Sequence, residues 1–306
     1  MKTEDFTFPS ATGVCTISAS CYKPDGDVDC VLVIHHGMAE HRERYNDFIE
    51  YLTSNGIAVF MHDMANHGRS NQDKTLTGYF GKYEGYKNLV KDLKTMFDRA
   101  KSTYPDKKII MMGHSMGSFI TRCFTAWYGN AGFDAAIYMG TGGANPIAGV
   151  GDKLSALVSK IKGPTYKSKT IDKMTFGSYN DKFEKRTASD WLTRDQSIVD
   201  KYIADEYCGF LFSVQGMNDL VKLNIEANTN QWYNSVPKNI PILLTSGDMD
   251  PVGNFGKGIK EINEKLLATD HSKTKIILYP QGRHEILNEI NKNEVYKDIL
   301  DFIKSV

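Results

Sequence analysis

Six almost continuous apolar runs, with helix-like segments between them, constrain the fold more than any other feature of the sequence. The runs occupy residues 29–37, 56–64, 109–113, 133–143, 240–248 and 274–282. Strands that are apolar on both faces are typical of a parallel sheet with helices on each side, because neither face meets water. The intervening segments, such as residues 85–105 and 258–269, carry apolar residues at helical spacing. This alternation predicts an α/β fold with a mostly parallel, doubly wound sheet flanked by helices. Residues 5–27 predict a hairpin at its edge.

One long interval lacks such a strand run. Between residues 144 and 236, aromatic and charged residues mix in helix-like patterns, for example DKLSALVSKI and SIVDKYIADEY. Connections in compact α/β units are usually short, so an interval of this size indicates an insertion. We therefore expect residues 1–143 and 237–306 to form one core and residues 144–236 to form an inserted cap. Open α/β sheets bind ligands at the carboxyl ends of their strands, where we expect the cap to lie.

The third apolar run leads directly into GHSMG, in which Ser115 lies between Gly113 and Gly117. Glycine is costly in backbone entropy unless the chain needs a shape or a close approach that larger residues forbid. A strand before the serine and a helix after it are the context of a nucleophile elbow, in which a sharp turn exposes the hydroxyl. The pattern is short and the chain contains 26 glycines, so Gly-x-Ser-x-Gly can also arise by chance as an ordinary turn. The assignment therefore depends on whether an acid, a base and an oxyanion hole are also present.

An acid and a base follow the last two apolar runs, in the order serine, acid, histidine that this architecture requires. Asp250 is the favoured acid because it lies well into its loop, whereas Asp248 lies at the strand end and can bond the backbone of the turn. His284 is favoured over the other histidines because it follows the last run, and the sharp turn is expected to point His114 elsewhere. We predict that Ser115 attacks a carbonyl carbon, His284 takes its proton and Asp250 stabilises the imidazolium.

Stabilising an oxyanion requires two hydrogen-bond donors aimed at one point. The backbone N–H of Met116, directly after the nucleophile, is expected to be one of them. The loop after the first run, HHGMAEHRERY, can supply the second, because Gly37 permits a turn that brings the N–H of Met38 inward. Taken alone, HHG is equally well interpreted as an ordinary turn between a strand and a helix.

Charge and composition exclude several other classes of protein. Lysine plus arginine equals aspartate plus glutamate, 37 each, so no net field attracts nucleic acid. His284-Glu285 lacks the second histidine of a zinc protease, since residue 288 is Asn288, and no phosphate-binding loop is present, so we expect neither a metal nor a cofactor. Five scattered cysteines without a CxxC pair, together with a start that lacks secretory character, predict a cytoplasmic location. Oligomeric state is not predicted.

Taken together, VIHHGMAEHRERY, DMANHGRS, GHSMG, SGDMDPVG and GRHEILNE resemble the α/β-hydrolase fold serine hydrolases. The similarity is greatest to the monoacylglycerol lipase, lysophospholipase and carboxylesterase family. The resemblance implies a triad of Ser115, Asp250 and His284, with the N–H groups of Met38 and Met116 as the oxyanion hole. It also implies a helical cap that includes ASDWLTRDQSIVDKYIADEYCGF, and a mainly structural role for DMANHGRS.

The sequence therefore predicts a serine carboxylic-ester hydrolase that acts on acyl glycerol or lysophospholipid-type esters through an acyl-enzyme. The alternatives are a proline-aminopeptidase-type serine peptidase, whose cap would need a carboxylate for the substrate amine, and a non-catalytic binding module on the same fold. Candidate carboxylates for the peptidase are Glu184, Asp190, Asp205 and Glu206. The segment GDKLSALVSKIKG could contact a membrane or micelle transiently, because lysines flank its apolar face, although a solvated helix packed on the core is the favoured interpretation.

Overall fold

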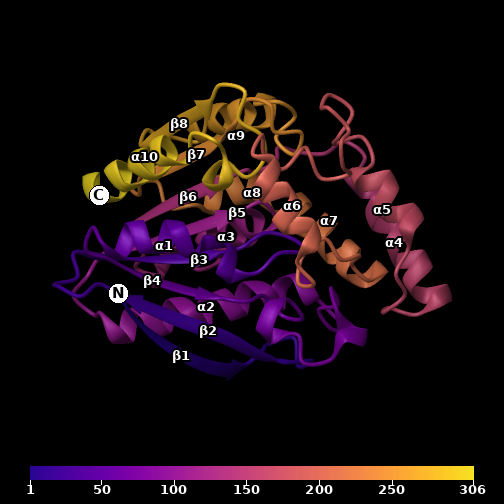
Figure 1. The fold of residues 1–306 in the computed structure, drawn as a ribbon, viewed down its shortest axis with the longest axis horizontal. Helices are drawn as coiled ribbons and strands as arrows, with labels where there is room; N and C mark the ends of the chain where they lie inside the picture. The colour runs from indigo at the N-terminus through magenta and orange to yellow at the C-terminus, as the bar shows by residue number, and fades with distance from the viewer.

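A single mixed sheet organises the chain. The computed structural model describes residues 1–306, and its eight strands have the order β1-β2-β4-β3-β5-β6-β7-β8 (Figure 1). β1 pairs with β2, and β2 with β4, in antiparallel fashion, and all other neighbours are parallel. The strands are β1 (Lys2–Pro9), β2 (Thr16–Lys23), β3 (Cys30–His35), β4 (Ile57–His62), β5 (Ile109–His114), β6 (Ala135–Met139), β7 (Ile242–Gly247) and β8 (Thr274–Tyr279). The predictions of a mostly parallel sheet and of an edge hairpin are confirmed.

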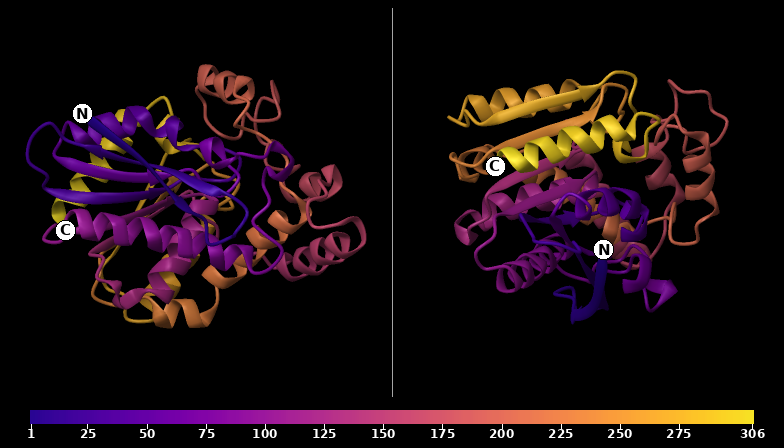
Figure 2. Two further views of the ribbon diagram at one scale, coloured as in Figure 1. Left: turned by 90° about the horizontal axis from the view of Figure 1, so that it is seen from below. Right: turned by 60° about the vertical axis from the view of Figure 1, so that its left-hand side comes forward.

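Helices cover both faces of this sheet (Figure 2). Successive residues of a strand point to opposite faces, so Val31 and Val33 of β3 enter one apolar core while Leu32 and Ile34 enter the other. The first core is completed by α2 (Gly85–Thr103), α3 (Met116–Trp127) and α9 (Lys257–Leu267), and the second by α1 (Asn46–Thr53) and α10 (Lys292–Ser305). Because β3 is buried on both faces, its side chains from Cys30 to Ile34 are all apolar, as the sequence indicated.

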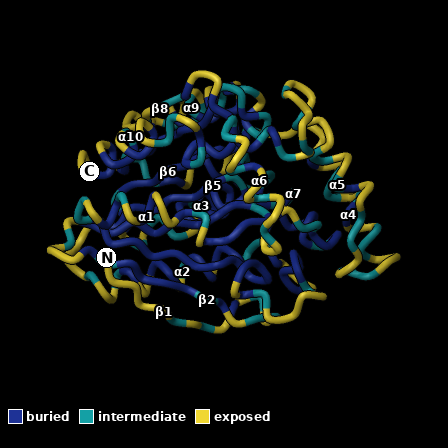
Figure 3. The backbone as a smooth tube through the Cα atoms, viewed as in Figure 1, coloured by how far each residue is buried: buried dark blue, intermediate teal, exposed yellow.

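Five helices lie between β6 and β7, in the interval that the sequence marked as an insertion. They are α4 (Ala148–Lys162), α5 (Lys169–Phe176), α6 (Gln196–Ala204), α7 (Val214–Ala227) and α8 (Asn230–Ser235). α4 and α5 stand away from the sheet and are largely exposed (Figures 1 and 3). α7 and α8 pack instead with the first core, which contains Leu223 and Trp232. The interval thus has an outlying part and a part continuous with the core.

The parallel strands bring several distant loops to the same edge of the sheet. The loops after β3, β5, β7 and β8 carry Met38, Ser115, Asp250 and His284 respectively. Parallel strands end at one edge, so residues far apart in sequence meet there. No helix combines the length and the apolar character that crossing a bilayer requires.

Candidate active site

Ser115 occupies a strained turn between β5 and α3. Its backbone angles are φ 53° and ψ −121°, a conformation that a residue other than glycine adopts only when its surroundings impose it. Its N–H donates to the carbonyl oxygen of Met139 at 3.0 Å. A Cβ atom on Gly117 would lie 2.3 Å from the carbonyl oxygens of His35 and His36, and one on Gly113 would lie 2.2 Å from the oxygen of Gly117. The two glycines therefore allow α3 to pack directly against β3 and β5, and this packing holds the turn.

His284 and Asp250 form a buried pair. Nδ1 of His284 lies 3.0 Å from Oδ1 of Asp250, and the Asp250 side chain is fully buried. The carboxylate also accepts hydrogen bonds from the Ser246 hydroxyl at 2.8 Å and from the N–H of Val252 at 2.9 Å. Burial alone would raise the pKa of Asp250, but the interaction with His284 and these donors hold the pKa below its usual value. Asp250 is therefore placed to orient the imidazole as an ionised carboxylate.

Asp248 has a different partner. Its Oδ1 accepts a hydrogen bond from the N–H of Gln281 at 2.6 Å, across the turns that follow β7 and β8. The structure therefore brings Asp250, and not Asp248, to His284.

Ser115 and His284 line the same cavity, which has a volume of about 540 Å³. No hydrogen bond joins the Ser115 hydroxyl to the imidazole of His284 in this structure. Nucleophile–base contacts in unliganded enzymes are often long and tighten when substrate binds. The serine is half-buried and the histidine is buried, so a substrate in the cavity would contact both.

Met38 and Met116 also line this cavity, and the N–H groups of both lack a protein acceptor. The loop that carries Met38 is held by two neutral histidines, since burial lowers the pKa of both His36 and His67. His36 donates from Nδ1 to the oxygen of Gly37 at 2.8 Å, and Nε2 of His67 accepts from the N–H of Ala39 at 3.3 Å. One free donor thus belongs to a loop held by these hydrogen bonds, and the other to the first residue of α3, directly after Ser115.

His114 lies where the sequence argument did not place it. Its ring packs against that of His284, with centroids 4.7 Å apart, and its Nδ1 lies 3.1 Å from Oε1 of Glu40. The expectation that the turn points His114 elsewhere is wrong, because the buried carboxylate of Glu40 needs donors and His114 is one of them. Glu40 also accepts from the N–H of Gly37 at 2.6 Å. Burial lowers the pKa of His114, but the bond to Glu40 outweighs it, and the net pKa is raised.

Glu40 and Trp191 are contacts of the site that the sequence argument missed. Glu40 bonds the loop of Met38 and is joined through Arg44 to Glu285, which follows His284. Trp191, from the insertion, packs on the ring of His284. For Glu40, the one signal in the sequence is its position three residues after Gly37, because a carboxylate at that spacing can accept a hydrogen bond from the earlier backbone N–H. No comparable signal marks Trp191.

The cavity wall is mainly apolar and comes from both parts of the molecule. Phe119 and Met38 contribute from the core, and Phe176, Tyr179, Phe210 and Leu220 from the insertion. Its volume falls within the roughly 300–1,000 Å³ of small-molecule sites. The arrangement offers an apolar compartment that ends at a serine hydroxyl, a histidine and two free N–H donors.

Comparison with known proteins gives one consistent family. Residues 26–291 match the family described as Serine aminopeptidase, S33. The chain is 25% identical to the monoacylglycerol lipase of Mycolicibacterium smegmatis, over 98% of this chain and 97% of that protein. It is 27% identical to the monoglyceride lipase homolog of Monkeypox virus, over 92% of each chain.

A solved structure matches the fold over its whole length. The thermostable carboxyl esterase of Bacillus coagulans, in complex with glycerol, superposes with a TM-score of 0.94 and 28% identity, covering 100% of this chain and 99% of that one. The similarity therefore includes the helices of the insertion as well as the sheet.

Proposed function

The chain belongs to the serine aminopeptidase S33 family of α/β-hydrolases and is a serine ester hydrolase, and from this premise we propose that it cleaves acylglycerol or lysophospholipid-type esters through an acyl-enzyme on Ser115. The observation that carries the proposal is the convergence of Ser115, the His284–Asp250 pair and two free N–H donors on one apolar cavity. In this proposal His284 takes the proton of Ser115 as the hydroxyl attacks the ester carbonyl.

The remaining steps follow from the same groups. Met38 and Met116 donate their N–H groups to the oxyanion of the tetrahedral intermediate. Collapse of that intermediate releases the alcohol, which receives its proton from His284. Water, deprotonated by His284, then attacks the acyl-enzyme and releases the carboxylic acid. Asp250 keeps the imidazole in the tautomer that accepts the serine proton and stabilises the imidazolium.

The four carboxylates that the sequence offered to a peptidase are not placed to bind a substrate amine. A peptidase that binds a free amine needs an available carboxylate near the site. Of the four candidates, Glu184 pairs with Arg283, Asp190 with the Thr187 hydroxyl, Asp205 with His41 and Glu206 with Lys74. None of the four lines the cavity; Asp172 of α5 is the cap carboxylate that does.

The substrate class is supported by the relatives and by the wall of the cavity. Two relatives are named as a monoacylglycerol lipase and a monoglyceride lipase homolog, and an apolar compartment suits an acyl chain. We assign the acyl-binding wall to the cap, proposed as residues 144–236, whose α5 and α7 contribute Phe176 and Leu220.

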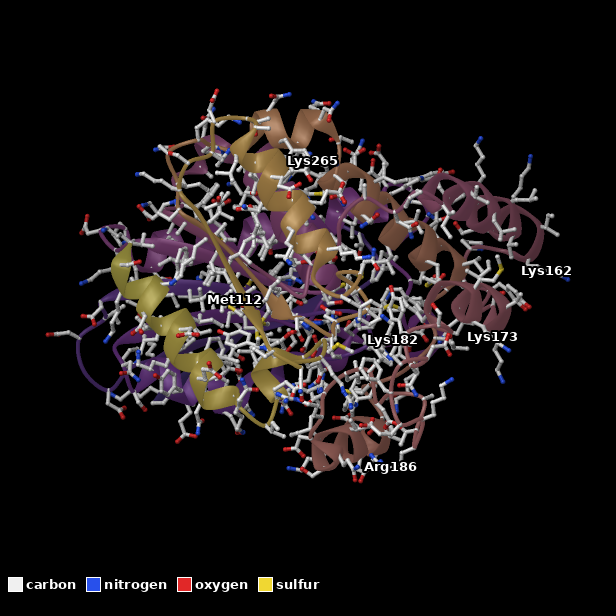
Figure 4. The ribbon with its side chains drawn as sticks, turned by 90° about the horizontal axis from the view of Figure 1, so that it is seen from above. Met112, Lys162, Lys173, Lys182, Arg186 and Lys265 are labelled. Atoms are coloured by element: carbon white, nitrogen blue, oxygen red, sulfur yellow. The ribbon has the colours of Figure 1, made fainter.

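We further propose that the outer face of α4 makes transient contact with lipid aggregates. Val150, Leu157 and Ile161 recur at helical spacing on that face and are 66%, 54% and 68% exposed. Lys162, near the end of α4, and Lys173 of α5 extend from this part of the molecule (Figure 4). An apolar helix face with lysines nearby suits the surface of a lipid aggregate, because the apolar side chains can enter the acyl region while the lysines meet anionic headgroups.

The proposed function is tested by measuring hydrolysis of 1-monoacylglycerols and p-nitrophenyl esters of increasing chain length, with Ser115→Ala as the control. We expect an optimum at medium or long chains that is lost in the variant. The same preparations are assayed on substrates with an amino-terminal proline, together with Asp172→Asn. Turnover of those substrates that depends on Asp172, with negligible ester hydrolysis, would establish the peptidase instead.

A further inference from the structure

A cluster of metal-binding side chains joins the insertion to the core at a point outside the catalytic groups. His41 belongs to the loop after β3, and Asp205 and Cys208 belong to the segment after α6. Nε2 of His41 lies 2.9 Å from Oδ2 of Asp205. One donor atom from each of the three residues lies within 4.8 Å of the others. No step of the proposed reaction uses any of them.

The three donor types are those that zinc prefers. Zn²⁺ is bound by thiolate, imidazole and carboxylate with bond lengths of about 2.0–2.3 Å, which places the ligand atoms of a tetrahedral site about 3.2–3.8 Å apart. His41 and Asp205, joined by a hydrogen bond of 2.9 Å, need to separate by only a few tenths of an ångström for an ion to replace that bond. Cys208 must approach by about 1 Å, which a change of side-chain torsion can provide. Asp205 is 29% exposed, so an ion can enter from solvent on its side.

The charges around the cluster allow a cation. Arg44 is the positively charged group that acts on both Asp205 and Cys208. Its guanidinium is paired with the carboxylates of Glu40 and Glu285, at 2.8 and 2.6 Å, so its charge is compensated. Binding of Zn²⁺ would displace the thiol proton of Cys208 to solvent and leave the remaining proton of His41 on Nδ1, which makes no hydrogen bond to the protein.

We propose that His41, Asp205 and Cys208 bind one thiophilic divalent cation, zinc being the best match, which fastens the insertion to the loop of Met38. The two segments already touch, since the N–H of Gly209 donates to the oxygen of Ala39 at 3.0 Å. Tyr202 donates its hydroxyl proton to the same oxygen at 3.2 Å. An ion on the three ligands adds a bridge between the same two segments, close to both contacts, because Cys208 precedes Gly209 and His41 lies two residues after Ala39.

The test uses Co²⁺ and Zn²⁺ added to the purified, untagged, metal-stripped full-length protein. Co²⁺ bound by a thiolate has a charge-transfer band in the near ultraviolet, and we expect this band to saturate at one ion per chain. Zn²⁺ should displace Co²⁺ and, at about a hundredfold excess over its dissociation constant, raise Tm by roughly 5 °C.

Cys208→Ser should abolish the band, and Asp205→Asn should weaken Zn²⁺ binding at least tenfold. Both replacements keep the size of the side chain, and their Tm without metal shows that they fold. Cys15→Ser, at the half-buried cysteine in the turn between β1 and β2, is the matched control and should leave binding unchanged. The absence of a thiolate band in the wild type, or its persistence in Cys208→Ser, would overturn the proposal.

Discussion

Trp191, in the insertion, packs against the ring of His284 with the two centroids 5.1 Å apart. Its carbonyl oxygen also accepts the N–H of His284 at 3.4 Å, and the next N–H, that of Glu285, donates to Leu192 at 2.7 Å. The segment around Trp191 thus runs alongside the loop of the proposed base. This part of the insertion contacts the proposed base directly, and α5 is linked to it through Tyr179, whose ring packs on those of Phe176 and Trp191.

Arg283 fastens the same segment and provides a test of its role. The guanidinium donates to the carbonyl oxygen of Asp190 at 2.5 Å and pairs with Glu184 at 2.7 and 2.9 Å. Arg283→Ala removes these bonds and should let the backbone of His284 shift. We expect kcat for a short ester to fall by roughly tenfold to a hundredfold, because small misplacements of a catalytic group are costly.

The prediction for Arg283 concerns kcat specifically. Since Arg283 does not line the cavity, KM for the short ester should change little. Arg186→Ala is the matched control, because Arg186 lies in the same segment and pairs on the surface with Asp200; its kcat should stay at the wild-type value. A change in KM without a fall in kcat would contradict a positioning role. So would an equal fall in kcat for Arg283→Ala and Arg186→Ala.

The two aspartates after β7 give a sharper contrast. Asp250→Asn should lower kcat by about 10⁴-fold, because an amide facing Nδ1 of His284 favours the wrong imidazole tautomer. The amide oxygen of Asn can still accept from the Ser246 hydroxyl, although the NH2 that faces Nδ1 gives up the bond from the N–H of Val252; the fold should persist, as measured by Tm. Asp248→Asn changes a residue of the same loop that bonds only the turn at Gln281, and we expect it to retain the wild-type rate. Equal losses in both variants would show that the loop, not the acid, is responsible.

The sequence could predict the part of the site that follows from local turns. Ser115, Asp250 and His284 each stand directly after an apolar run, and the carboxyl ends of parallel strands meet at one edge whatever the details of packing. The same reasoning gave Met38, since the first run ends in a glycine. These assignments needed only the order of strands and loops along the chain.

What the sequence could not predict depends on pairing between distant segments. Glu40 and His114 are 74 residues apart, and Arg283 and Asp190 are 93 residues apart. The residues next to His114 in the sequence do not indicate that its ring will bond the buried carboxylate of Glu40 and so lie beside His284. Likewise, the apolar spacing of α7 is the same whether it covers a cap or the core, so its packing beside α3 appears only in three dimensions.

Asp219 gives a prediction for stability against pH. This side chain of α7 is buried; Oδ1 accepts the N–H of Tyr86 at 3.0 Å, and Oδ2 has no hydrogen-bond partner. Burial raises the pKa of Asp219 to about 7. The folded state therefore holds the proton more tightly than the unfolded state, whose pKa is about 3.9. This contribution to stability is complete below the unfolded pKa and is lost as pH rises through 7.

Asp219→Asn should remove this pH dependence. Between pH 5 and 8 the wild type should lose about 2 kcal/mol of unfolding free energy relative to the variant, most of it before pH 7. Urea unfolding at a series of pH values measures the difference. Asp200→Asn, at an exposed position of α6, is the control and should follow the wild type. Parallel pH curves for the wild type and Asp219→Asn would show that the carboxyl does not titrate in this range.

The outer face of α4 gives a prediction that separates lipid contact from catalysis. Leu157 and Ile161 are exposed and lie far enough along the helix from the cavity that neither lines it. Replacing both with serine should lower the rate on micellar or vesicular long-chain monoacylglycerol at least about fivefold, because each buried apolar side chain contributes roughly 1.5–3 kcal/mol. Hydrolysis of a dissolved short ester should not change. Leu267→Ser, at an exposed leucine of α9, controls for a general loss of surface hydrophobicity. If the double variant hydrolyses the aggregated substrate as fast as the wild type does, lipid contact lies elsewhere on the molecule.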